Sequence, residues 1–267
     1  MAQLDARCAV LCAWVFDLEG GGEPPFGFQV LDILRGAGNG YLGAVLHGAG
    51  PDGGIFVVNR GTRFDTRSPG ALFGGLKEDL GTAGAILAGA AAIPALDAAV
   101  AAALAVQARW PNAGALRFTG QSLGGGLAQL QGAACLAARA RNAALPDIRV
   151  VTFGAMDVSR TLRRRLSAEL QAALGSRAEN AVSDRDGLTG PRGVLGTSAV
   201  GEQRVVRDMD GPRPGGAFAF HRARAWVNHC EGLPVDAPER PHPRDWAGWD
   251  ALRRRGWLPP GWPAERD

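Results

Sequence analysis

Several features that would mark a specialised class of protein are scarce in this sequence of 267 residues. Lysine is almost absent beside arginine, and the formal net charge of +3 is too small to indicate a nucleic-acid partner. The few cysteines form no CxxC pair, and no pair of them has a histidine at metal-ligand spacing. This is typical of buried, reduced thiols and not of a disulfide framework or a metal site. The cysteines are Cys8, Cys12, Cys135 and Cys230.

No segment has the composition of a membrane span or of an ordinary secretory signal. The apolar run after Asp5 is too short to cross a bilayer, and it lacks a basic segment before it and a convincing cleavage site after it. The alanine-rich stretch 81–106 is interrupted by Pro94 and Asp97, which favours a pair of soluble helices. We therefore expect a cytoplasmic protein, or one exported without a cleaved signal peptide, such as a secreted effector.

The hydrophobic pattern indicates an α/β protein. Hydrophobic residues make up 46% and charged residues 21%, which is ordinary for a globular chain. Short apolar runs alternate with helical segments, so we expect a mostly parallel central sheet with helices on both faces. The predicted strands are 41–47, 55–59, 115–119, 148–153 and 178–182, the predicted helices are 95–110, 123–140 and 159–174, and a hairpin is expected at 202–207.

Two regions differ in composition. Residues 1–232 have the pattern of one α/β domain, whereas 233–267 are rich in proline, arginine and tryptophan. We expect this C-terminal extension to pack on the domain, although its tryptophans could instead contact a membrane surface transiently.

A G-x-S-x-G motif is the clearest chemical signal in the chain. Its residues are Gly120, Gln121, Ser122, Leu123 and Gly124. An apolar strand precedes the motif and a helix follows it, which is the setting of a nucleophile elbow. Small residues two before and two after the serine permit the sharp turn that exposes its hydroxyl, and the next backbone N–H then faces the place where an oxyanion forms. The alternative is a glycine-rich helix start with a capping serine.

Five sequence blocks together resemble the class 3 lipases, the triacylglycerol-lipase-like family of α/β-hydrolases. The elbow FTGQSLGGGLAQL is one of them, and the family order of the five is kept over residues 54–226. The resemblance implies the α/β-hydrolase fold for residues 1–232. The other four blocks are GIFVVNRGT at 54–62, VVTFGA at 150–155, NAVSDRDGL at 180–188 and HRARAW at 221–226.

The resemblance also implies roles for particular residues. Ser122 would be the nucleophile, His221 its general base and Asp186 the acid that orients the imidazole. Thr62 and the N–H of Leu123 would supply the oxyanion hole. Neither a cofactor nor a metal is implied.

Further residues, within the blocks or just after the first of them, would have supporting roles. Asp79 resembles an acid that helps to hold the oxyanion residue, while Arg60 and Gly61 would shape the loop before Thr62. Gly120 and Gly124 flank the nucleophile. Gln121 departs from the family, which commonly has histidine there, but this position is not that of the catalytic base.

Three assignments have rivals within the sequence. Asp184 competes with Asp186 as the acid, and we prefer Asp186 because glycine and leucine follow it as in the family. Thr62 could simply be a turn-forming threonine. His221 competes with the other histidines, although its block and the Ser–Asp–His order favour it; these others are His47, His229 and His242.

These motifs predict a serine carboxylic ester hydrolase that cleaves acyl esters of lipids or phospholipids through an acyl-enzyme. Residues 63–95 occupy the place of a lipase lid, and an ordinary buried helix is an equally good interpretation. Alternative functions are hydrolysis of small soluble esters or thioesters, or ligand binding by a non-catalytic relative. We expect no nucleic-acid partner.

Overall fold

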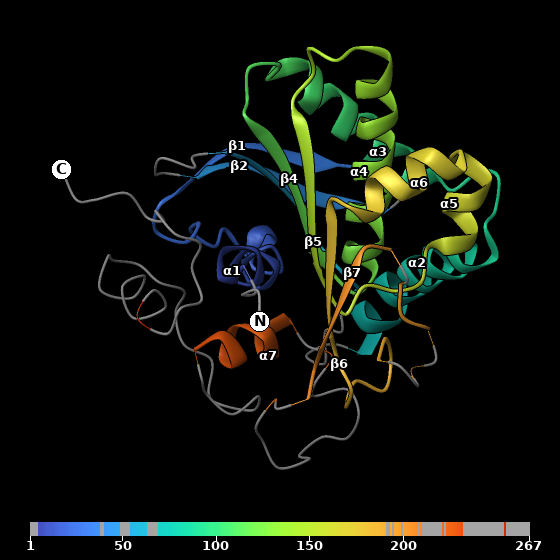
Figure 1. Ribbon diagram of the computed structural model, residues 1–267. Coiled ribbons are helices and arrows are strands. Elements are labelled where there is room, and N and C mark those ends of the chain that lie inside the picture. The colour runs from blue at the N-terminus through green and yellow to red at the C-terminus, as the bar shows by residue number, and fades with distance from the viewer. Residues whose placement is uncertain are drawn as a thin grey trace.

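A seven-stranded sheet with helices on both faces forms the body of the molecule (Figure 1). The computed structural model describes residues 5–37, 40–48, 54–62, 69–190, 193, 195–198, 200–207, 209, 221, 223–231 and 254, with side chains from residue 79 onward in the segment 69–190. Within these residues, strand order follows chain order, from β1 at one edge to β7 at the other.

The strands of the sheet run mostly parallel. β1, β2 and β3 pair antiparallel, and β3 to β7 all pair parallel. The mostly parallel sheet predicted from the sequence is therefore confirmed, and the antiparallel first edge includes a strand, β1, that was not predicted. The strands are β1 Phe28–Arg35, β2 Leu42–Gly48, β3 Ile55–Asn59, β4 Ala115–Gln121, β5 Asp147–Phe153, β6 Ala178–Ser183 and β7 Glu202–Val206.

Helices cover the two faces unequally. Parallel crossovers are right-handed, so a series of crossovers that advances in one direction places its helices on the same face. Five helices pack on that face, and α1 with α7 covers the other (Figure 1). The predicted cover on both faces is thus confirmed. The helices are α1 Ala6–Trp14, α2 Pro69–Ala88, α3 Pro94–Arg109, α4 Leu123–Arg141, α5 Ser159–Arg165, α6 Ala168–Gly175 and α7 Ala223–Cys230.

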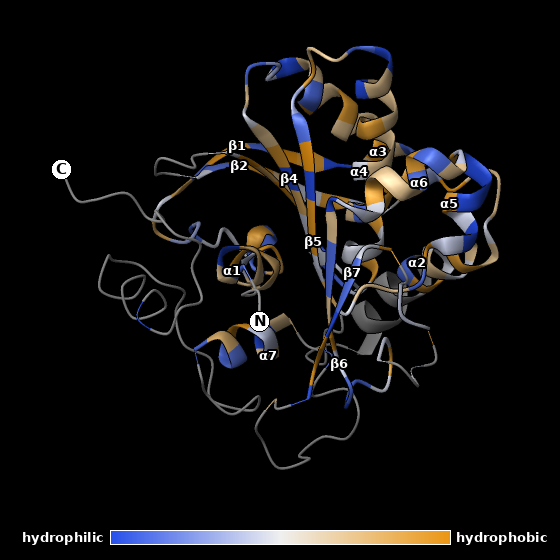
Figure 2. Cartoon of the chain, viewed as in Figure 1, coloured by the Kyte–Doolittle hydropathy of each residue, from blue (hydrophilic) through white to orange (hydrophobic). Residues whose placement is uncertain are grey.

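Helix α1 is buried between the sheet and α7. Figure 2 shows its hydrophobic character, and it forms one apolar core together with α7 and one face of the sheet. Asp5 caps the helix by accepting the N–H of Arg7 and also pairs with the Arg7 guanidinium at 2.8 Å, so this buried charge is compensated. All four cysteines are buried free thiols.

Two predicted elements differ from the structure. The helix expected over 159–174 is interrupted at Leu166, and α6 begins anew because the hydroxyl of Ser167 accepts the N–H of Leu170. The hairpin expected at 202–207 is wrong, because this segment is a single strand that pairs parallel with β6. Parallel pairing joins residues distant in sequence, so local turn residues did not reveal it.

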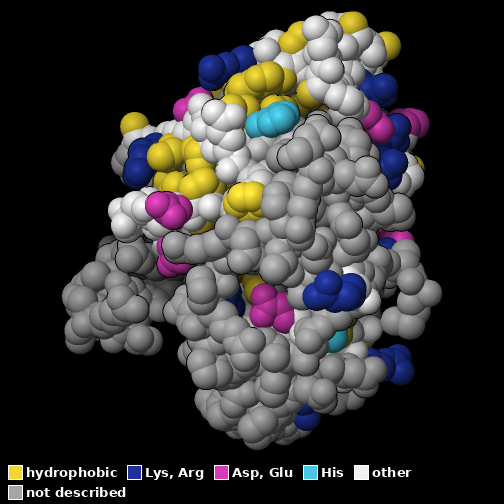
Figure 3. All heavy atoms as spheres, turned by 90° about the vertical axis from the view of Figure 1, so that its left-hand side faces the viewer, with side chains coloured by type: hydrophobic (Ala, Val, Ile, Leu, Met, Phe, Trp, Pro, Cys, Tyr) yellow, Lys and Arg dark blue, Asp and Glu magenta, His cyan; other side chains and the backbone are white. Residues whose placement is uncertain are grey.

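Some predictions concern residues that the structure does not describe. The C-terminal extension 233–267 lies outside the described residues except for Arg254. In the predicted lid region 63–95, residues 63–68 lie outside the described residues, and helix α2 follows them. None of the described helices combines the length and apolar character needed to cross a membrane. Figure 3 shows apolar side chains gathered in the upper part of one face, and large exposed apolar residues of the described chain are Ile33, Leu80 and Val205.

Candidate active site

Ser122 occupies a sharp turn between β4 and α4. Its φ of 58° and ψ of −123° make it the one non-glycine residue with positive φ in the described part of the chain. Such a conformation is strained for an L-residue and persists where the surroundings enforce it. The flanking glycines permit the turn: a methyl group at Gly120 would lie 2.3 Å from the Gly124 carbonyl carbon, and one at Gly124 would lie 2.4 Å from the Asn59 carbonyl oxygen.

The backbone of Ser122 is fixed from both sides. Its N–H donates to the Phe153 carbonyl at 3.1 Å, and its carbonyl accepts the N–H groups of Gly126 and Met156. The Phe153 ring in turn packs against Trp226 of α7, with centroids 5.5 Å apart. The end of β5 therefore links the elbow to the helix that follows His221.

Three side chains form a continuous hydrogen-bonded row. His221 Nε2 lies 2.7 Å from Ser122 Oγ, and His221 Nδ1 lies 2.8 Å from Asp186 Oδ2. The residues are only 3–4% exposed, so water competes little for these bonds. The structure thus brings together the serine, histidine and aspartate that the sequence singled out.

The Asp186 carboxylate accepts a set of hydrogen bonds in the turn after β6. Oδ1 accepts the backbone N–H groups of Leu188 and Thr189, and Oδ2 accepts the Thr189 hydroxyl at 2.8 Å as well as His221. Burial by itself would raise the pKa of Asp186, but the hydrogen bonds and the charge of His221 outweigh it and hold that pKa below its usual range. The carboxyl group is therefore ionised at neutral pH.

The rival residues lie elsewhere. Asp184 is exposed and its backbone N–H pairs with Val206 of β7. His47 is an exposed residue of β2 and His229 a partly exposed residue of α7. His242 lies outside the described residues.

Two residues that support the row were not recognised from the sequence. The Thr189 hydroxyl lies 3.3 Å from His221 Nδ1 while it donates to Asp186, so it contacts both members of the pair. A methyl group at Gly154, where φ is +52°, would lie 2.8 Å from that hydroxyl. Thr189 directly follows the sequence block 180–188. The sequence signal that could have identified it was a hydroxyl-bearing residue three positions after Asp186.

Gln121 has a structural role beside the nucleophile. It ends β4, is buried, and its side-chain Nε2 donates to the backbone carbonyl of His221. The residue that replaces the histidine common in the resembled family therefore anchors the chain at His221.

The loop after β3 lies against the elbow. A methyl group at Gly61 would lie 2.6 Å from the Gln121 carbonyl oxygen, which shows how closely the two segments approach. The Arg60 guanidinium pairs with Glu19 at 2.7 Å, and Thr62 is 9% exposed. Leu123 is the first residue of α4, where backbone N–H groups have no partner within the helix.

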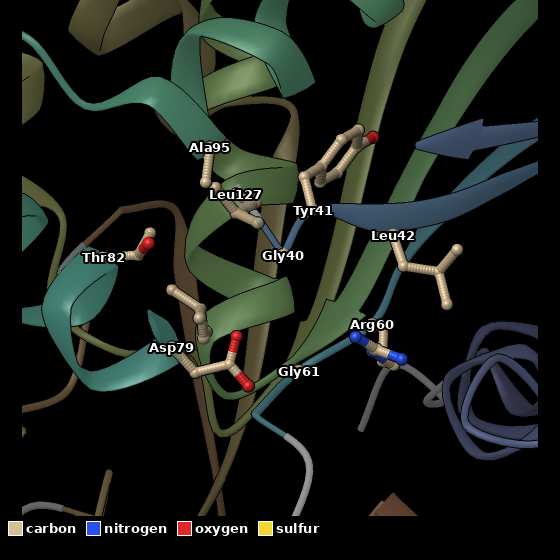
Figure 4. Close-up of a pocket in the computed structure, with 10 residues that line it drawn as sticks. Gly40, Tyr41, Leu42, Arg60, Gly61, Asp79, Thr82, Ala95 and Leu127 are labelled. Atoms are coloured by element: carbon tan, nitrogen blue, oxygen red, sulfur yellow. The ribbon is translucent and has the colours of Figure 1, made fainter. Parts of the chain in front are cut away.

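A pocket opens beside this loop (Figure 4). It includes Gly61 and Leu123, and the Asp79 carboxylate points toward Gly61 from α2. Leu123, the residue that follows the nucleophile, is among its lining residues. The full lining is Gly40, Tyr41, Leu42, Arg60, Gly61, Asp79, Thr82, Ala95, Leu123 and Leu127.

The chemistry of this arrangement is that of an activated hydroxyl. An imidazole nitrogen within hydrogen-bond distance can accept the serine proton, and an ionised carboxylate behind the ring stabilises the resulting imidazolium. In the part of the chain that the structure describes, no group of three or more His, Cys, Asp or Glu residues is placed to hold a metal ion.

Comparisons with known proteins find structural likeness only. No family model and no curated protein sequence matches the chain. Among solved structures, it is similar to a triacylglycerol lipase from Penicillium expansum, with 15% identity, a TM-score of 0.47, and coverage of 76% of this chain and 81% of that one. It is also similar to Rhizomucor miehei lipase in a propeptide complex (16%, TM-score 0.43, 68% of this chain and 58% of that one). A nonglycosylated lipase of Yarrowia lipolytica is similar at 17% identity, with a TM-score of 0.43 and coverage of 68% of this chain and 70% of that one. All three are described as lipases.

Proposed function

We propose that the protein is a serine carboxylic ester hydrolase that acts on acyl esters of lipids. The observation that carries the proposal is the buried row from Ser122 Oγ through His221 to Asp186, at 2.7 and 2.8 Å, on a strand–turn–helix elbow. Each contact has the length of a good hydrogen bond, and the chain order is that of α/β-hydrolases.

Hydrolysis would proceed in two steps. Ser122 Oγ attacks the ester carbonyl carbon as its proton passes to His221 Nε2, and the tetrahedral oxyanion accepts hydrogen bonds from the Leu123 N–H and Thr62. The C–O bond to the alcohol then breaks as the imidazolium returns the proton to the leaving oxygen. Water, deprotonated by the same imidazole, attacks the acyl-enzyme; the bond to Ser122 Oγ then breaks as the imidazolium returns the proton to that oxygen, and the carboxylic acid is released.

The oxyanion donors are the remaining part of the proposal. Leu123 offers a backbone N–H at the positive end of the α4 dipole, so a negative oxygen there is favoured without any side chain. Thr62 follows Gly61, the residue in close approach to Gln121, and Asp79 faces that glycine from α2. Asp79 would hold the loop that carries the second donor.

Replacement of the nucleophile tests the proposal. Ser122→Ala should abolish hydrolysis of p-nitrophenyl butyrate and covalent labelling by a fluorophosphonate, with an unchanged circular dichroism spectrum and melting temperature. Ser176→Ala is a matched control, because Ser176 is an exposed serine at the end of α6. Full activity or full labelling of the Ser122→Ala protein would contradict the proposal.

The lipid substrate needs its own measurement. For a lipid esterase, kcat/KM should rise with acyl length and the rate should increase when the substrate forms micelles. A preference for acetyl esters, with no increase above the micelle concentration, would indicate a small soluble ester instead. A phospholipid and a triacylglycerol of equal acyl length then separate the two lipid classes.

A further inference from the structure

Three buried polar side chains form a closed ring of hydrogen bonds beneath the loop that carries Thr62. Tyr41 Oη donates to Asn59 Oδ1 at 3.0 Å, Asn59 Nδ2 donates to Gln131 Oε1 at 2.7 Å, and Gln131 Nε2 donates to Tyr41 Oη at 3.0 Å. Their exposed fractions are 5%, 0% and 0% in the same order. No sequence motif identified this ring.

The ring has one hydrogen-bonding direction. Each side chain donates to the next and accepts from the previous one, and reversal of either amide would place two donors or two acceptors face to face. The second N–H of Gln131 donates to the Ala99 carbonyl of α3, and the second N–H of Asn59 donates to the Thr119 carbonyl of β4. Bonds in such a closed, dry chain polarise one another and define a single arrangement of the parts they join.

Two further features preserve the ring. Burial raises the pKa of Tyr41 well above its usual range, so the phenol is a neutral donor at neutral pH. Gly43 leaves the space that the ring needs, since a methyl group there would lie 3.1 Å from Tyr41 Oη and 2.8 Å from the Val58 carbonyl oxygen. The ring therefore depends on a small residue at position 43.

The elements that the ring joins are those that supply the two oxyanion donors. Asn59 is the last residue of β3, three residues before Thr62, and Gln131 lies on α4, whose first residue is Leu123. The first turn of α4 also touches the same backbone, because Gly124 approaches the Asn59 carbonyl. The β3 end and the α4 helix are thus connected once through backbone contact and once through the ring.

We infer that Tyr41, Asn59 and Gln131 are positioning residues, which set the distance between the loop carrying Thr62 and the N-terminus of α4. This inference rests on the proposed function. Asn59 and Gln131 are fully buried and Tyr41 directs its hydroxyl into the ring, so the ring would act through the oxyanion donors. Loss of the ring should therefore weaken transition-state stabilisation more than substrate binding.

A second glutamine on the same helix provides a matched control. Gln129 is also 0% exposed, but it bonds to Thr152 of β5 and to Ser198, on the side away from β3. Replacement of Gln129 or Gln131 by methionine removes the same amide from a buried site. Of the two changes, the one at Gln131 removes the side-chain link between β3 and α4.

The test compares Tyr41→Phe, Gln131→Met and Gln129→Met in the full-length protein. Three quantities are measured for each: kcat and KM for p-nitrophenyl butyrate, the inhibition constant of an alkylboronic acid that forms a tetrahedral adduct on Ser122, and the melting temperature. Removal of a whole oxyanion donor typically costs 10²–10³ in kcat, so misplacement should lower kcat about 10- to 100-fold. KM should stay within about two-fold, and boronate affinity should fall in parallel with kcat.

The outcomes separate the inference from the proposed function. The melting temperature of Gln129→Met should fall by about as much as that of Gln131→Met. Its kcat should stay within about two-fold of the parent value. Folded Tyr41→Phe and Gln131→Met proteins with parental kcat and boronate affinity would overturn the inference, as would an equal loss of kcat in Gln129→Met. Tyr41→Phe decides the matter if Gln131→Met does not fold, because it removes one hydroxyl and keeps the aromatic packing. A parent protein that neither hydrolyses the ester nor reacts with a fluorophosphonate would overturn the proposed function, and the inference with it.

Discussion

The two halves of the candidate site are built in different ways. The nucleophile half consists of β3, β4 and the start of α4, where regular elements meet through glycines with backbone almost in contact. The acid–base half consists of the turn after β6 and of His221, where backbone and side-chain hydrogen bonds hold Asp186 and His221. In the first half, close backbone approach acts together with the ring of Tyr41, Asn59 and Gln131, whereas in the second half hydrogen bonds hold the catalytic side chains themselves.

This difference predicts two kinds of sensitivity. Backbone cannot move aside for an added methyl group, so a small substitution in the nucleophile half should disrupt the site as a whole. Hydrogen bonds can be removed singly, and each loss should produce a graded effect. Mutations matched for size or charge can test whether the two halves differ in this way.

The largest effect is expected for Gly124→Ala in the nucleophile half. The new methyl group would lie 2.4 Å from the Asn59 carbonyl oxygen and 2.8 Å from the Arg60 carbonyl carbon. Activity should fall more than about 10³-fold because both the elbow and the oxyanion loop must shift. The melting temperature should fall by about 5 °C, as measured by calorimetry.

Gly114→Ala is the control for that change. Gly114 lies just before β4, and a methyl group there meets nothing within 4 Å. Its activity should equal that of the parent. If Gly124→Ala retained activity, the steric account of the nucleophile half would be wrong.

In the acid–base half, Asp186→Asn should lower kcat by about 10³-fold, because a neutral amide stabilises neither the imidazolium nor the required tautomer. The pKa of Asp186 is held below its usual range, so the native group is a carboxylate at the pH of the assay. Asp184→Asn makes the same chemical change at an exposed position two residues away and should leave kcat unchanged. If kcat fell further in Asp184→Asn than in Asp186→Asn, Asp184 and not Asp186 would be the acid that supports His221.

The smallest effect is expected for Thr189→Val, which keeps the shape of the side chain and removes one hydroxyl. Oδ2 of Asp186 would lose one of its two side-chain donors while His221 remains bonded, so kcat should fall about five- to ten-fold. Thr189→Ser should restore most of the activity, since the hydroxyl returns. Steady-state kinetics with one short ester suffices, and equal defects in the two variants would show that packing, not the hydroxyl, matters there.

Prediction from the sequence succeeded where the signal was local. The strand–glycine–helix pattern around Ser122 requires a turn whatever surrounds it, and the predicted strands β3 to β6 lie within a few residues of the observed ones. It failed where distant segments decide. The interruption at Leu166 coincides with a serine cap at Ser167 and with no glycine or proline nearby, and the pairing of β7 with β6 depends on a connection of 18 residues.

The residue types at Gly120, Ser122 and Gly124 suffice to predict a hydroxyl on a strained turn at the start of a helix, because such a turn tolerates them. A histidine and an aspartate follow from the resemblance, without any geometry between them. The packing of the folded chain was needed to show that Asp186 and not Asp184 faces His221, and that Thr189, Gln121 and the ring of Tyr41, Asn59 and Gln131 surround the site. Side-chain hydrogen bonds join residues 100 or more positions apart, and their partners are chosen by how the layers pack and not by spacing along the chain.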